Sequence, residues 1–372
     1  MKTGGTEPGG PGRVRRILWV GTNPGGGGTE THMVTMLQAL ASAGVDTHAL
    51  VHPGGRIASA LANGPVTQHA GVFRNSADLR GIRALDRVLK AIRPDVVVGS
   101  FSKEYWPLAL LARRHGHPLV LFRHMDLRLR PSTRGLLSRW PLRLFAISRY
   151  LQRRLVEQGL PASRVEYLPN PLIPENFVRD PAARRELRRQ LGIAEDAFLA
   201  GYVGAWHRGK GVFALADAVD AAHARDPRIH ALWLGGGVHG EAFRQRLQDC
   251  PWHRLAGWQD DPAPWYSAMD ALALPSIEPD TFGRVCVEAQ ACGTPVLGSN
   301  LGGIPEAFAP DRSGLLLPPG DVAAWTGALL RMADDSRLRE DMGAAGRPEI
   351  RRFDARQVAA RFLETLETHE TF

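Results

Sequence analysis

Short apolar runs alternate with amphipathic stretches of helical length along most of this sequence, and no other feature constrains the fold as strongly. Residues 16–21 form the first apolar run. Residues 29–43 follow it, with Met33, Met36 and Leu40 spaced so that they share one helical face. Because a strand followed by such a helix pairs in parallel with the next strand, the pattern predicts an α/β fold.

The alternation runs through the first half of the chain and restarts in the second half. In the first half we expect strands at 16–21, 47–51, 66–70, 95–99, 119–122, 144–147 and 164–168, and helices at 29–43, 78–92, 103–115 and 149–158. In the second half we expect strands at 198–204, 230–234, 253–257, 271–274 and 295–298, and helices at 181–191, 212–224, 241–248, 284–292, 322–333 and 356–368. The pattern predicts two doubly wound, Rossmann-like domains that face a cleft, with ligands beyond the carboxyl ends of the strands.

Closely spaced prolines mark the predicted domain boundary. Pro169, Pro171 and Pro174 follow the last expected strand of the first half, and proline disfavours helix on both of its sides. We therefore expect a first domain over 14–172 and a second over 173–353. Residues 1–13 are rich in glycine and proline without an apolar run, which predicts a disordered leader and not a signal peptide.

Composition narrows the class of protein. No run approaches the roughly 18–20 apolar residues of a membrane-spanning helix. Cys250, Cys286 and Cys292 show no metal-binding spacing and are odd in number, which predicts free thiols in the cytosol. The net charge of +8 predicts an anionic partner, whether a phosphate-bearing ligand, an acidic membrane surface or a nucleic acid.

The first glycine cluster lies between the first expected strand and helix. Four glycines precede Thr29 and Glu30, so Gly27 and Gly28 fall where a helix begins and where free N–H groups attract phosphate. The alternative is a flexible loop. Glu30 occupies the third-glycine position of a dinucleotide fingerprint, and no GK[ST] follows, so the cluster is neither that fingerprint nor a P-loop.

A second glycine cluster, at 235–240, does match GxGxxG after an expected strand. Dinucleotide binding is therefore an alternative interpretation. The fingerprint also needs an acidic residue about 20 positions further on, at a strand end. Asp260 and Asp261 are the nearest candidates, and they are better interpreted as the cap of the next helix.

Two further segments carry charge at expected strand ends. Arg208 and Lys210 lie in a glycine-bounded turn, and Lys210 is one of only four lysines in the chain. A lysine supplies a compact point charge, although a solvated turn residue is the alternative. After the strand at 271–274, Asp280 precedes an expected helix and Glu288 lies within it. The start of that helix is a second candidate anion site, and the two carboxylates suit a polyhydroxylated ligand.

Together these motifs resemble the retaining GT-B glycosyltransferases of family four, nearly end to end. The Gly-Gly-x-Glu motif is found at 27–30, a Lys-Gly turn at 210–211, and the paired acids with an internal Phe-Gly at 280–288. The resemblance extends to Gly-Gly-Ile-Pro-Glu at 302–306. It implies a last helix, 354–372, that packs back on the first domain.

The resemblance also implies residue roles. The departing diphosphate would be stabilised by Arg208, Lys210 and the helix start at Gly283. These groups would take the place of a metal ion. The implied catalytic residues are Arg208, Lys210, Asp280 and His124, with His124 beside the transferred sugar. The other implied donor-binding residues are Gly27, Gly28, Thr281, Phe282, Gly283 and Glu288, and Glu288 would hold the ribose. The implied acceptor-side residues are Glu30, Arg123 and Asp126.

This chain departs from the family pattern at two places. Asp280 stands where the family has glutamate, and Glu278 competes for its role. Ala205 stands where an arginine is common, and Arg208 supplies that charge, as in the subgroup resembling lipopolysaccharide-core glucosyltransferases.

The expected function is therefore metal-independent sugar transfer from a UDP- or GDP-linked donor to a glycan or lipid-linked acceptor. No cofactor, metal or nucleic acid is expected. One alternative is a sugar-nucleotide 2-epimerase, for which Glu30, Asp78 and Asp126 provide few carboxylates. Another is a non-enzymatic binder of an anionic polymer. Residues 123–154 carry nine arginines and interleaved apolar residues around Trp140, which predicts a cytoplasmic enzyme docked peripherally on the inner membrane face.

Overall fold

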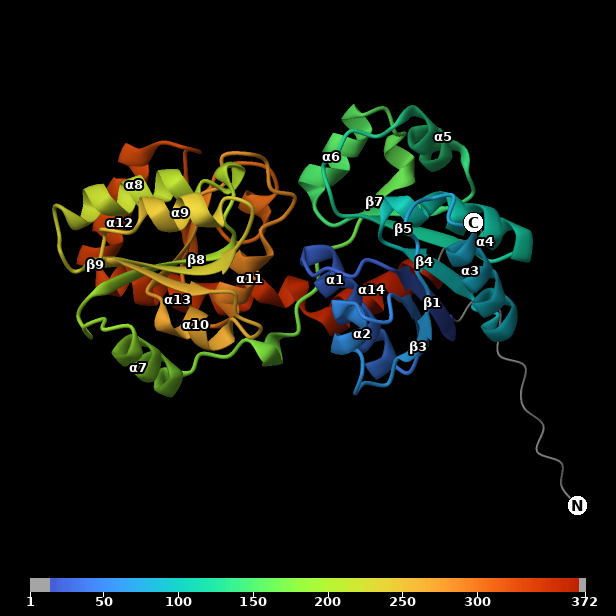
Figure 1. Cartoon of the computed structure of the whole chain (residues 1–372), viewed down its shortest axis with the longest axis horizontal. Coiled ribbons are helices and arrows are strands. Elements are labelled where there is room, and N and C mark those ends of the chain that lie inside the picture. The colour runs from blue at the N-terminus through green and yellow to red at the C-terminus, as the bar shows by residue number, and fades with distance from the viewer. Residues whose placement is uncertain (1–13, 368–372) are drawn as a thin grey trace, which may run out of the picture. The chain divides into compact units, whose positions relative to one another are not determined.

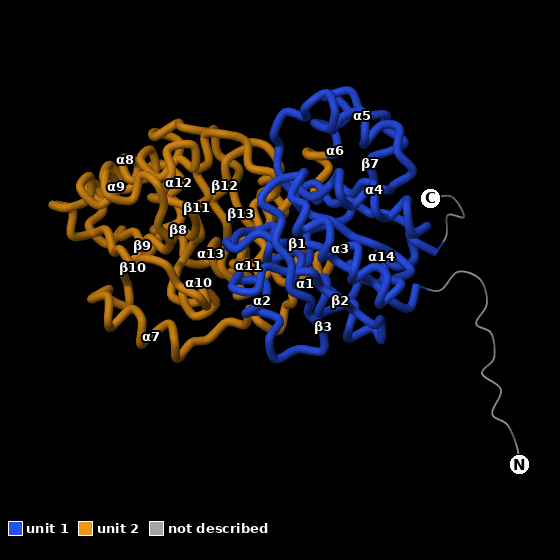
Figure 2. Tube along the Cα trace, turned by 45° about the vertical axis from the view of Figure 1, so that its right-hand side comes forward, with its two compact units in different colours: residues 1–147, 152–171, 355–372 blue, residues 148–151, 172–354 orange. Residues whose placement is uncertain are grey.

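The computed structural model describes residues 14–367, so the predicted leader at 1–13 lies outside the described residues. The chain forms two compact units, coloured separately in Figure 2. Unit 1 holds residues 1–147, 152–171 and 355–372, and unit 2 holds residues 148–151 and 172–354. Apart from residues 148–151, the chain passes from unit 1 to unit 2 just after Pro171 and returns just after Asp354.

Unit 1 is built on a seven-stranded sheet in the order β3-β2-β1-β4-β5-β6-β7, with every pair parallel. Its strands are β1 (Arg16–Gly21), β2 (Asp46–Val51), β3 (Thr67–Ala70), β4 (Val96–Gly99), β5 (Leu119–Arg123), β6 (Arg143–Ala146) and β7 (Val165–Tyr167). The central strands are buried along most of their length, as the continuous apolar runs predict. The α/β expectation is confirmed here.

Helices cover both faces of this sheet. They are α1 (Gly28–Ser42), α2 (Arg56–Ala60), α3 (Leu79–Ile92), α4 (Tyr105–His115), α5 (Pro131–Arg139), α6 (Arg149–Glu157) and α14 (Ala355–Glu367). The last helix, α14, packs against α1, and its Phe362 contacts the rings of Trp19, Phe122 and Phe145 in the core. Residues from the end of the chain therefore complete the first unit.

Unit 2 has a six-stranded parallel sheet in the order β10-β9-β8-β11-β12-β13. Its strands are β8 (Phe198–Ala205), β9 (Ile229–Gly236), β10 (His253–Gly257), β11 (Ala271–Leu274), β12 (Val296–Ser299) and β13 (Gly314–Leu317). Its helices are α7 (Pro181–Gln190), α8 (Val212–His223), α9 (Gly240–Arg246), α10 (Ala263–Ala268), α11 (Arg284–Ala291), α12 (Val322–Asp334) and α13 (Ser336–Glu349). Figure 1 shows α8, α9 and α12 over one face of this sheet, with α10, α11 and α13 on the other.

Five elements were not expected from the sequence: α2, α5, α10, α13 and β13. Both α2 and α10 are short, with five and six residues, so neither shows a helical period. Helix α13 contains Gly343, Gly346 and Pro348, which have low helix propensity, so packing and not propensity specifies it. Helix α5 follows β5, where no helix was expected, and it begins with Pro131 at its first position.

Candidate functional site

The first charged turn of unit 2 follows β8 directly. Residues Arg208–Lys210 form one turn of 3₁₀ helix, and His207 caps it because its Nδ1 accepts the Gly209 N–H at 3.0 Å. Gly211 ends the turn at φ 72°. A Cβ there would lie 1.9 Å from the Pro275 carbonyl oxygen, so glycine allows the turn to dock on the segment after β11.

The lysine of this turn pairs with one of the two candidate acids. Lys210 Nζ lies 2.6 Å from Asp280 Oδ2, and both side chains are partly exposed. Glu278 approaches the same turn through its backbone, since its N–H donates to the Gly209 carbonyl at 2.9 Å. The Asp280 carbonyl in turn accepts the Gly303 N–H at 2.7 Å. Three segments distant in sequence therefore meet at the carboxyl edge of the sheet.

Arg208 is exposed on the same turn and is held by an aromatic ring. Its guanidinium carbon lies 4.8 Å from the centroid of the Phe213 ring, on the first turn of α8. A cation over an aromatic face at this distance is attracted to it. The turn therefore presents a second positive charge beside that of Lys210.

Helix α11 begins at the loop that carries Asp280. Its N-cap, Gly283, adopts φ 86° and offers no side-chain hydrogen bond to the first turn. Phe282 is buried with its ring 5.3 Å from that of Phe353, so only its backbone can meet a ligand. The Thr281 carbonyl accepts the Ser148 hydroxyl at 2.6 Å within unit 2. These contacts therefore hold the backbone of residues 281–283 in place directly before α11.

The second acid of the motif, Glu288, is buried and has two protein partners. Tyr266 donates its hydroxyl to Glu288 Oε2 at 2.7 Å, and Arg284 Nε donates to Oε1 at 2.8 Å. Burial, and then the neighbouring carboxylate, raise the pKa of Tyr266 well above its usual value, so the phenol remains a donor. A carboxylate has about four acceptor positions, so Glu288 keeps capacity for a ligand hydroxyl.

Sequence reasoning missed both partners of Glu288. Arg284 stands four residues before it, a spacing that predicts a pair on one helix face. Tyr266 lies on α10, an element that was not expected, and no local signal connects it to Glu288.

Buried polar atoms without partners gather at the same edge of unit 2. Among the described residues, the atoms that lack a hydrogen-bond partner include Trp206 Nε1, His239 Nδ1, Ser276 Oγ and Ser299 Oγ. These residues follow or end β8, β9, β11 and β12. Since buried polar groups are normally paired, this concentration is typical of a site for a polar ligand.

The glycine-rich segment of unit 1 begins α1. Gly27 is its N-cap, and the Gly27 carbonyl accepts the Thr31 N–H at 3.0 Å. Gly28 faces open space, with no atom within 4 Å of an ideal Cβ. Glu30 is buried, and its carboxylate accepts a hydrogen bond from the Asn23 side-chain amide. Glu30 therefore joins the two ends of this loop.

His124 follows β5 directly, and its ring is buried. Its centroid lies 4.6 Å from that of His32 on α1, in an edge-to-face contact. Burial, with a smaller effect of Arg123, lowers the pKa of His124 to about 3, so the ring is neutral at physiological pH. Among the described residues neither of its nitrogens has a hydrogen-bond partner.

The two predicted acceptor-side residues beside His124 have structural partners. Arg123 donates to the Ser102 hydroxyl at 2.7 Å and to the Leu127 carbonyl at 2.8 Å. Asp126 accepts from Arg154 Nε at 2.9 Å. These contacts fix the loop between β5 and α5.

Glu104 is a buried carboxyl at the same edge that sequence reasoning missed. Its Oε1 accepts both the N–H and the hydroxyl of Thr22, at 2.8 and 2.6 Å, directly after β1. Burial raises the pKa of Glu104 to about 7, against the opposing effects of Thr22 and Lys103. It therefore links the ends of β1 and β4 at the start of the glycine-rich loop.

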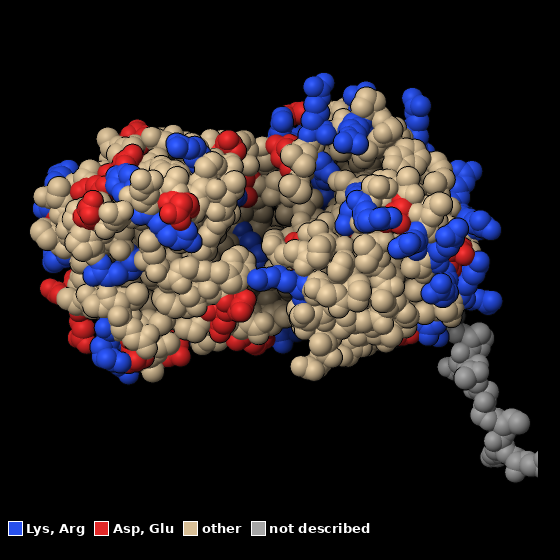
Figure 3. Space-filling view, in the orientation of Figure 1, with Lys and Arg blue, Asp and Glu red and all other residues tan. Residues whose placement is uncertain are grey.

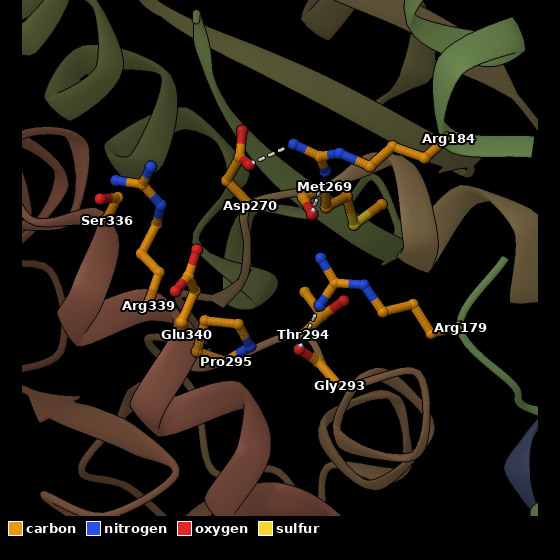
Figure 4. A pocket seen from close by; sticks show the side chains of 10 residues that line it. All are labelled: Arg179, Arg184, Met269, Asp270, Gly293, Thr294, Pro295, Ser336, Arg339 and Glu340. Atoms are coloured by element: carbon orange, nitrogen blue, oxygen red, sulfur yellow. Dashed lines mark hydrogen bonds and ion pairs between the residues drawn. The ribbon is translucent and has the colours of Figure 1, made fainter. Parts of the chain in front are cut away.

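A cavity of about 140 Å³ lies elsewhere in unit 2, beside the amino ends of β11 and β12 (Figure 4). Its arginines are engaged by backbone carbonyls at helix ends. Arg184 donates to the carbonyls of Ser267, Ala268 and Met269, and Arg339 donates to that of Ala333 at 3.0 Å. The cavity contains none of the predicted site residues, and its arginines stabilise helix termini.

Residues 14–367 hold no group of three histidine, cysteine or acidic side chains arranged for a metal ion. In the same residues no helix combines the length and the apolar character that crossing a bilayer requires.

Family models match both parts of the chain. The model described as Glycosyltransferase Family 4 matches residues 26–176, and the model described as Glycosyl transferases group 1 matches residues 197–335. The two matches follow one another along the sequence and together include every predicted site residue.

Curated relatives carry glycosyltransferase names. A D-inositol 3-phosphate glycosyltransferase of Paenarthrobacter aurescens (strain TC1) is 31% identical over 194 residues, which cover 50% of this chain and 47% of the relative. The chain thus spans about half the length of such relatives. The lipopolysaccharide core biosynthesis glycosyltransferase LpsD of Rhizobium meliloti (strain 1021) is 27% identical over 342 residues, which cover 90% of this chain and 93% of LpsD.

Solved structures share the fold of the whole chain. Anabaena HepE in complex with UDP and glucose superposes with a TM-score of 0.82 at 21% identity, covering 95% of this chain and 99% of HepE. WaaG, described as a glycosyltransferase involved in lipopolysaccharide biosynthesis, superposes with a TM-score of 0.70 at 16% identity, covering 95% of this chain and 100% of WaaG. At these identities the likeness concerns the fold.

Proposed function

The chain belongs to the GT-B glycosyltransferases, and from this premise we propose that it transfers a sugar from a nucleotide diphosphate sugar to a glycan or lipid-linked acceptor. The observation that carries the proposal is the Lys210–Asp280 pair, at 2.6 Å, where the cationic turn meets the start of α11. At this place the cations of Arg208 and Lys210 lie with the N-terminus of α11 and the carboxylate of Asp280. That combination suits a sugar diphosphate.

The reaction needs stabilisation of the departing diphosphate as negative charge develops on it. Lys210 and Arg208 supply fixed positive charge, and the α11 start supplies N–H groups, so this chain's own groups do what a metal ion does elsewhere. Asp280 holds Lys210 in place and accepts hydrogen bonds from sugar hydroxyls. We propose that transfer is metal-independent and retains the anomeric configuration, as the family resemblance implies.

Glu288 of unit 2 and His124 of unit 1 each have a proposed role in donor binding. Glu288 holds the ribose with the acceptor positions that Tyr266 and Arg284 leave available. His124 acts as a neutral hydrogen-bonding group beside the transferred sugar, because its lowered pKa keeps it uncharged at physiological pH. In unit 1, Gly28 leaves open space at the N-terminus of α1 for close approach of a ligand.

A binding screen tests the donor class. The chain is incubated with UDP, GDP and their glucose conjugates while its thermal unfolding is followed. A ligand at about 100 times its Kd should add about 2.7 kcal/mol of stability. The HepE complexes with UDP and glucose make uridine compounds the first choice. Stabilisation by none of these compounds, together with no release of UDP or GDP from the conjugates, would contradict the proposal.

EDTA provides the test of metal independence. We expect turnover with the active conjugate to remain within about twofold after dialysis against EDTA. An absolute requirement for Mg²⁺ or Mn²⁺ would contradict the mechanism.

The two units carry opposite net charges, which bears on the acceptor. Unit 1 contains 25 Lys and Arg residues against 13 Asp and Glu, a net charge of +12, whereas unit 2 contains 21 against 25, a net charge of −4. Figure 3 shows basic side chains projecting from the part of unit 1 around α5. The overall charge of +8 therefore comes entirely from unit 1.

The basic part of unit 1 also exposes apolar side chains. Met125 and Leu127, before α5, are 55% and 56% exposed. Trp140, after α5, contacts the ring of Trp106 and the guanidinium of Arg113. We propose that the surface along α5 docks on an anionic bilayer, where each arginine contributes about 1 kcal/mol. A lipid-linked acceptor, such as the lipopolysaccharide core named for LpsD, fits this placement.

Sedimentation with vesicles tests the docking surface. We expect binding to anionic but not to neutral vesicles at low salt, and its loss when Arg128, Arg130, Arg134 and Arg139 are changed to serine. The matched control changes four exposed arginines of unit 2, namely Arg185, Arg225, Arg331 and Arg337. Equal sedimentation with both vesicle types, or with neither, would show a solvated basic surface and favour a soluble acceptor.

The carboxylates considered for a 2-epimerase have other partners. Glu30 accepts from Asn23, and Asp126 pairs with Arg154. Asp78 caps α3 through the Arg80 N–H. Structural roles for all three favour the transferase.

A further inference from the structure

The GxGxxG segment at 235–240 has a packing role that brings two histidines together. Strands β8 and β9 pair to their ends, with Gly204 beside Gly235. Gly235 adopts φ 127°, and a Cβ there would lie 1.9 Å from the Gly204 carbonyl oxygen. Only glycine permits this approach of the two strand ends. The glycines therefore have a structural explanation that requires no dinucleotide.

Hydrogen bonds continue this contact beyond the strands. Trp206 N–H donates to the Gly236 carbonyl at 2.6 Å, and His239 N–H donates to the Trp206 carbonyl at 3.2 Å. The loop after β9 is thereby fixed against the loop after β8. As a result, the rings of His207 and His239 lie 5.0 Å apart between centroids.

This histidine pair, His207 and His239, flanks the cationic turn. His207 Nδ1 accepts the Gly209 N–H at 3.0 Å, so the neutral His207 ring carries its proton on Nε2 and can donate it. His239 Nδ1 is buried and, within the described residues, has no hydrogen-bond partner. Both residues are half-buried, so both remain partly accessible to solvent.

Charged groups of both signs surround the histidine pair. Arg208 and Lys210 lie on the turn that His207 caps, and Arg244 lies over the Trp206 ring at 5.5 Å. Asp280 pairs with Lys210, Glu241 pairs with Arg244 at 3.3 Å, and the carboxylate of Glu278 lies against Gly209 in the same turn. Imidazole N–H donors beside the positive charges of Arg208 and Lys210 suit the oxygens of an anionic ligand.

We propose that His207 and His239 are further binding residues for the diphosphate of the donor. The inference rests on the proposed function. The histidine pair supplies N–H donors on and beside the turn that carries Arg208 and Lys210. The GxGxxG segment contributes to donor binding indirectly, because its glycines allow the approach that places His239 beside His207.

Calorimetric titration of the whole chain tests the inference. The probes are UDP, inorganic pyrophosphate and uridine, and the variants are His207→Asn, His239→Asn and the double variant. Asparagine at 207 keeps an acceptor for the Gly209 N–H and so preserves the cap of the turn. The control is His230→Asn, at the opposite end of the same strand, β9.

We expect each single variant to weaken binding of UDP and pyrophosphate about tenfold, as loss of a hydrogen bond to a charged group does. Uridine binding and the control variant should be unchanged. Wild-type affinity for UDP or pyrophosphate in the double variant would overturn the inference while leaving the proposed function intact. An equal loss of uridine binding would assign the histidines to general folding of the site and would overturn it too. Failure of the wild-type chain to bind any nucleotide or pyrophosphate would contradict the proposed function and, with it, the inference.

Discussion

Glu104 offers a quantitative test of the electrostatics of unit 1. Its pKa is raised from 4.5 to about 7, chiefly by burial. In the unfolded chain the carboxyl loses its proton near pH 4.5, whereas the folded chain keeps it until about pH 7. Between these pH values the folded state binds more protons, so the free energy of unfolding falls as pH rises. At 1.36 kcal/mol for each pKa unit, the total loss is about 3 kcal/mol.

Glu104→Gln removes the titration and keeps an oxygen for the two Thr22 donors. We expect this variant to resemble wild type near pH 4.5, to lack the decline between pH 4.5 and 7, and to exceed wild-type stability at pH 8 by up to about 3 kcal/mol. Pulse proteolysis in urea, with fragments assigned by mass spectrometry, reports the unfolding of unit 1 separately. Such resolution is needed because two-domain chains seldom unfold in one step.

Glu157→Gln is the matched control, because Glu157 is an exposed carboxylate in the same unit. It should follow the wild-type pH dependence. If Glu104→Gln also followed it, the carboxyl would ionise near its ordinary pKa, and the Thr22 hydrogen bonds and Lys103 would outweigh burial. The reasoning from burial would then be refuted.

Three further predictions concern the donor site. Lys210→Ala should lower turnover by a factor on the order of a hundred, because its charge acts on the leaving group in the transition state; a value within threefold of wild type would make Lys210 a simple turn residue. Glu288→Gln should weaken donor binding and also cost about 1–3 kcal/mol of stability, since Arg284 loses its carboxylate; isothermal titration and urea unfolding measure the two effects. Asp280→Asn should reduce turnover more than Glu278→Gln, because Asp280 is the acid that pairs with Lys210. The reverse order in a side-by-side rate assay would move the first acidic role to Glu278.

Much of the architecture is predictable from the sequence because strand and helix periods are local. Every expected strand is present, with bounds that differ by at most two residues, and the glycine, lysine and acidic motifs follow strand ends as expected. The missed elements are those with weak local signals. Helix α10 has six residues, and β13 is a run of four that reads equally well as a loop.

The sequence by itself determined the alternation of strands and helices, the positions of the strand ends, and the residue types found there. Only the tertiary structure decided which groups pair, since pairing depends on how strands that are distant in sequence lie side by side. It selected Asp280 over Glu278 for Lys210, placed Tyr266 on Glu288, and set His239 beside His207. It also buried His124 and Glu104, whose pKa values shift in opposite directions because burial disfavours the charged form of each.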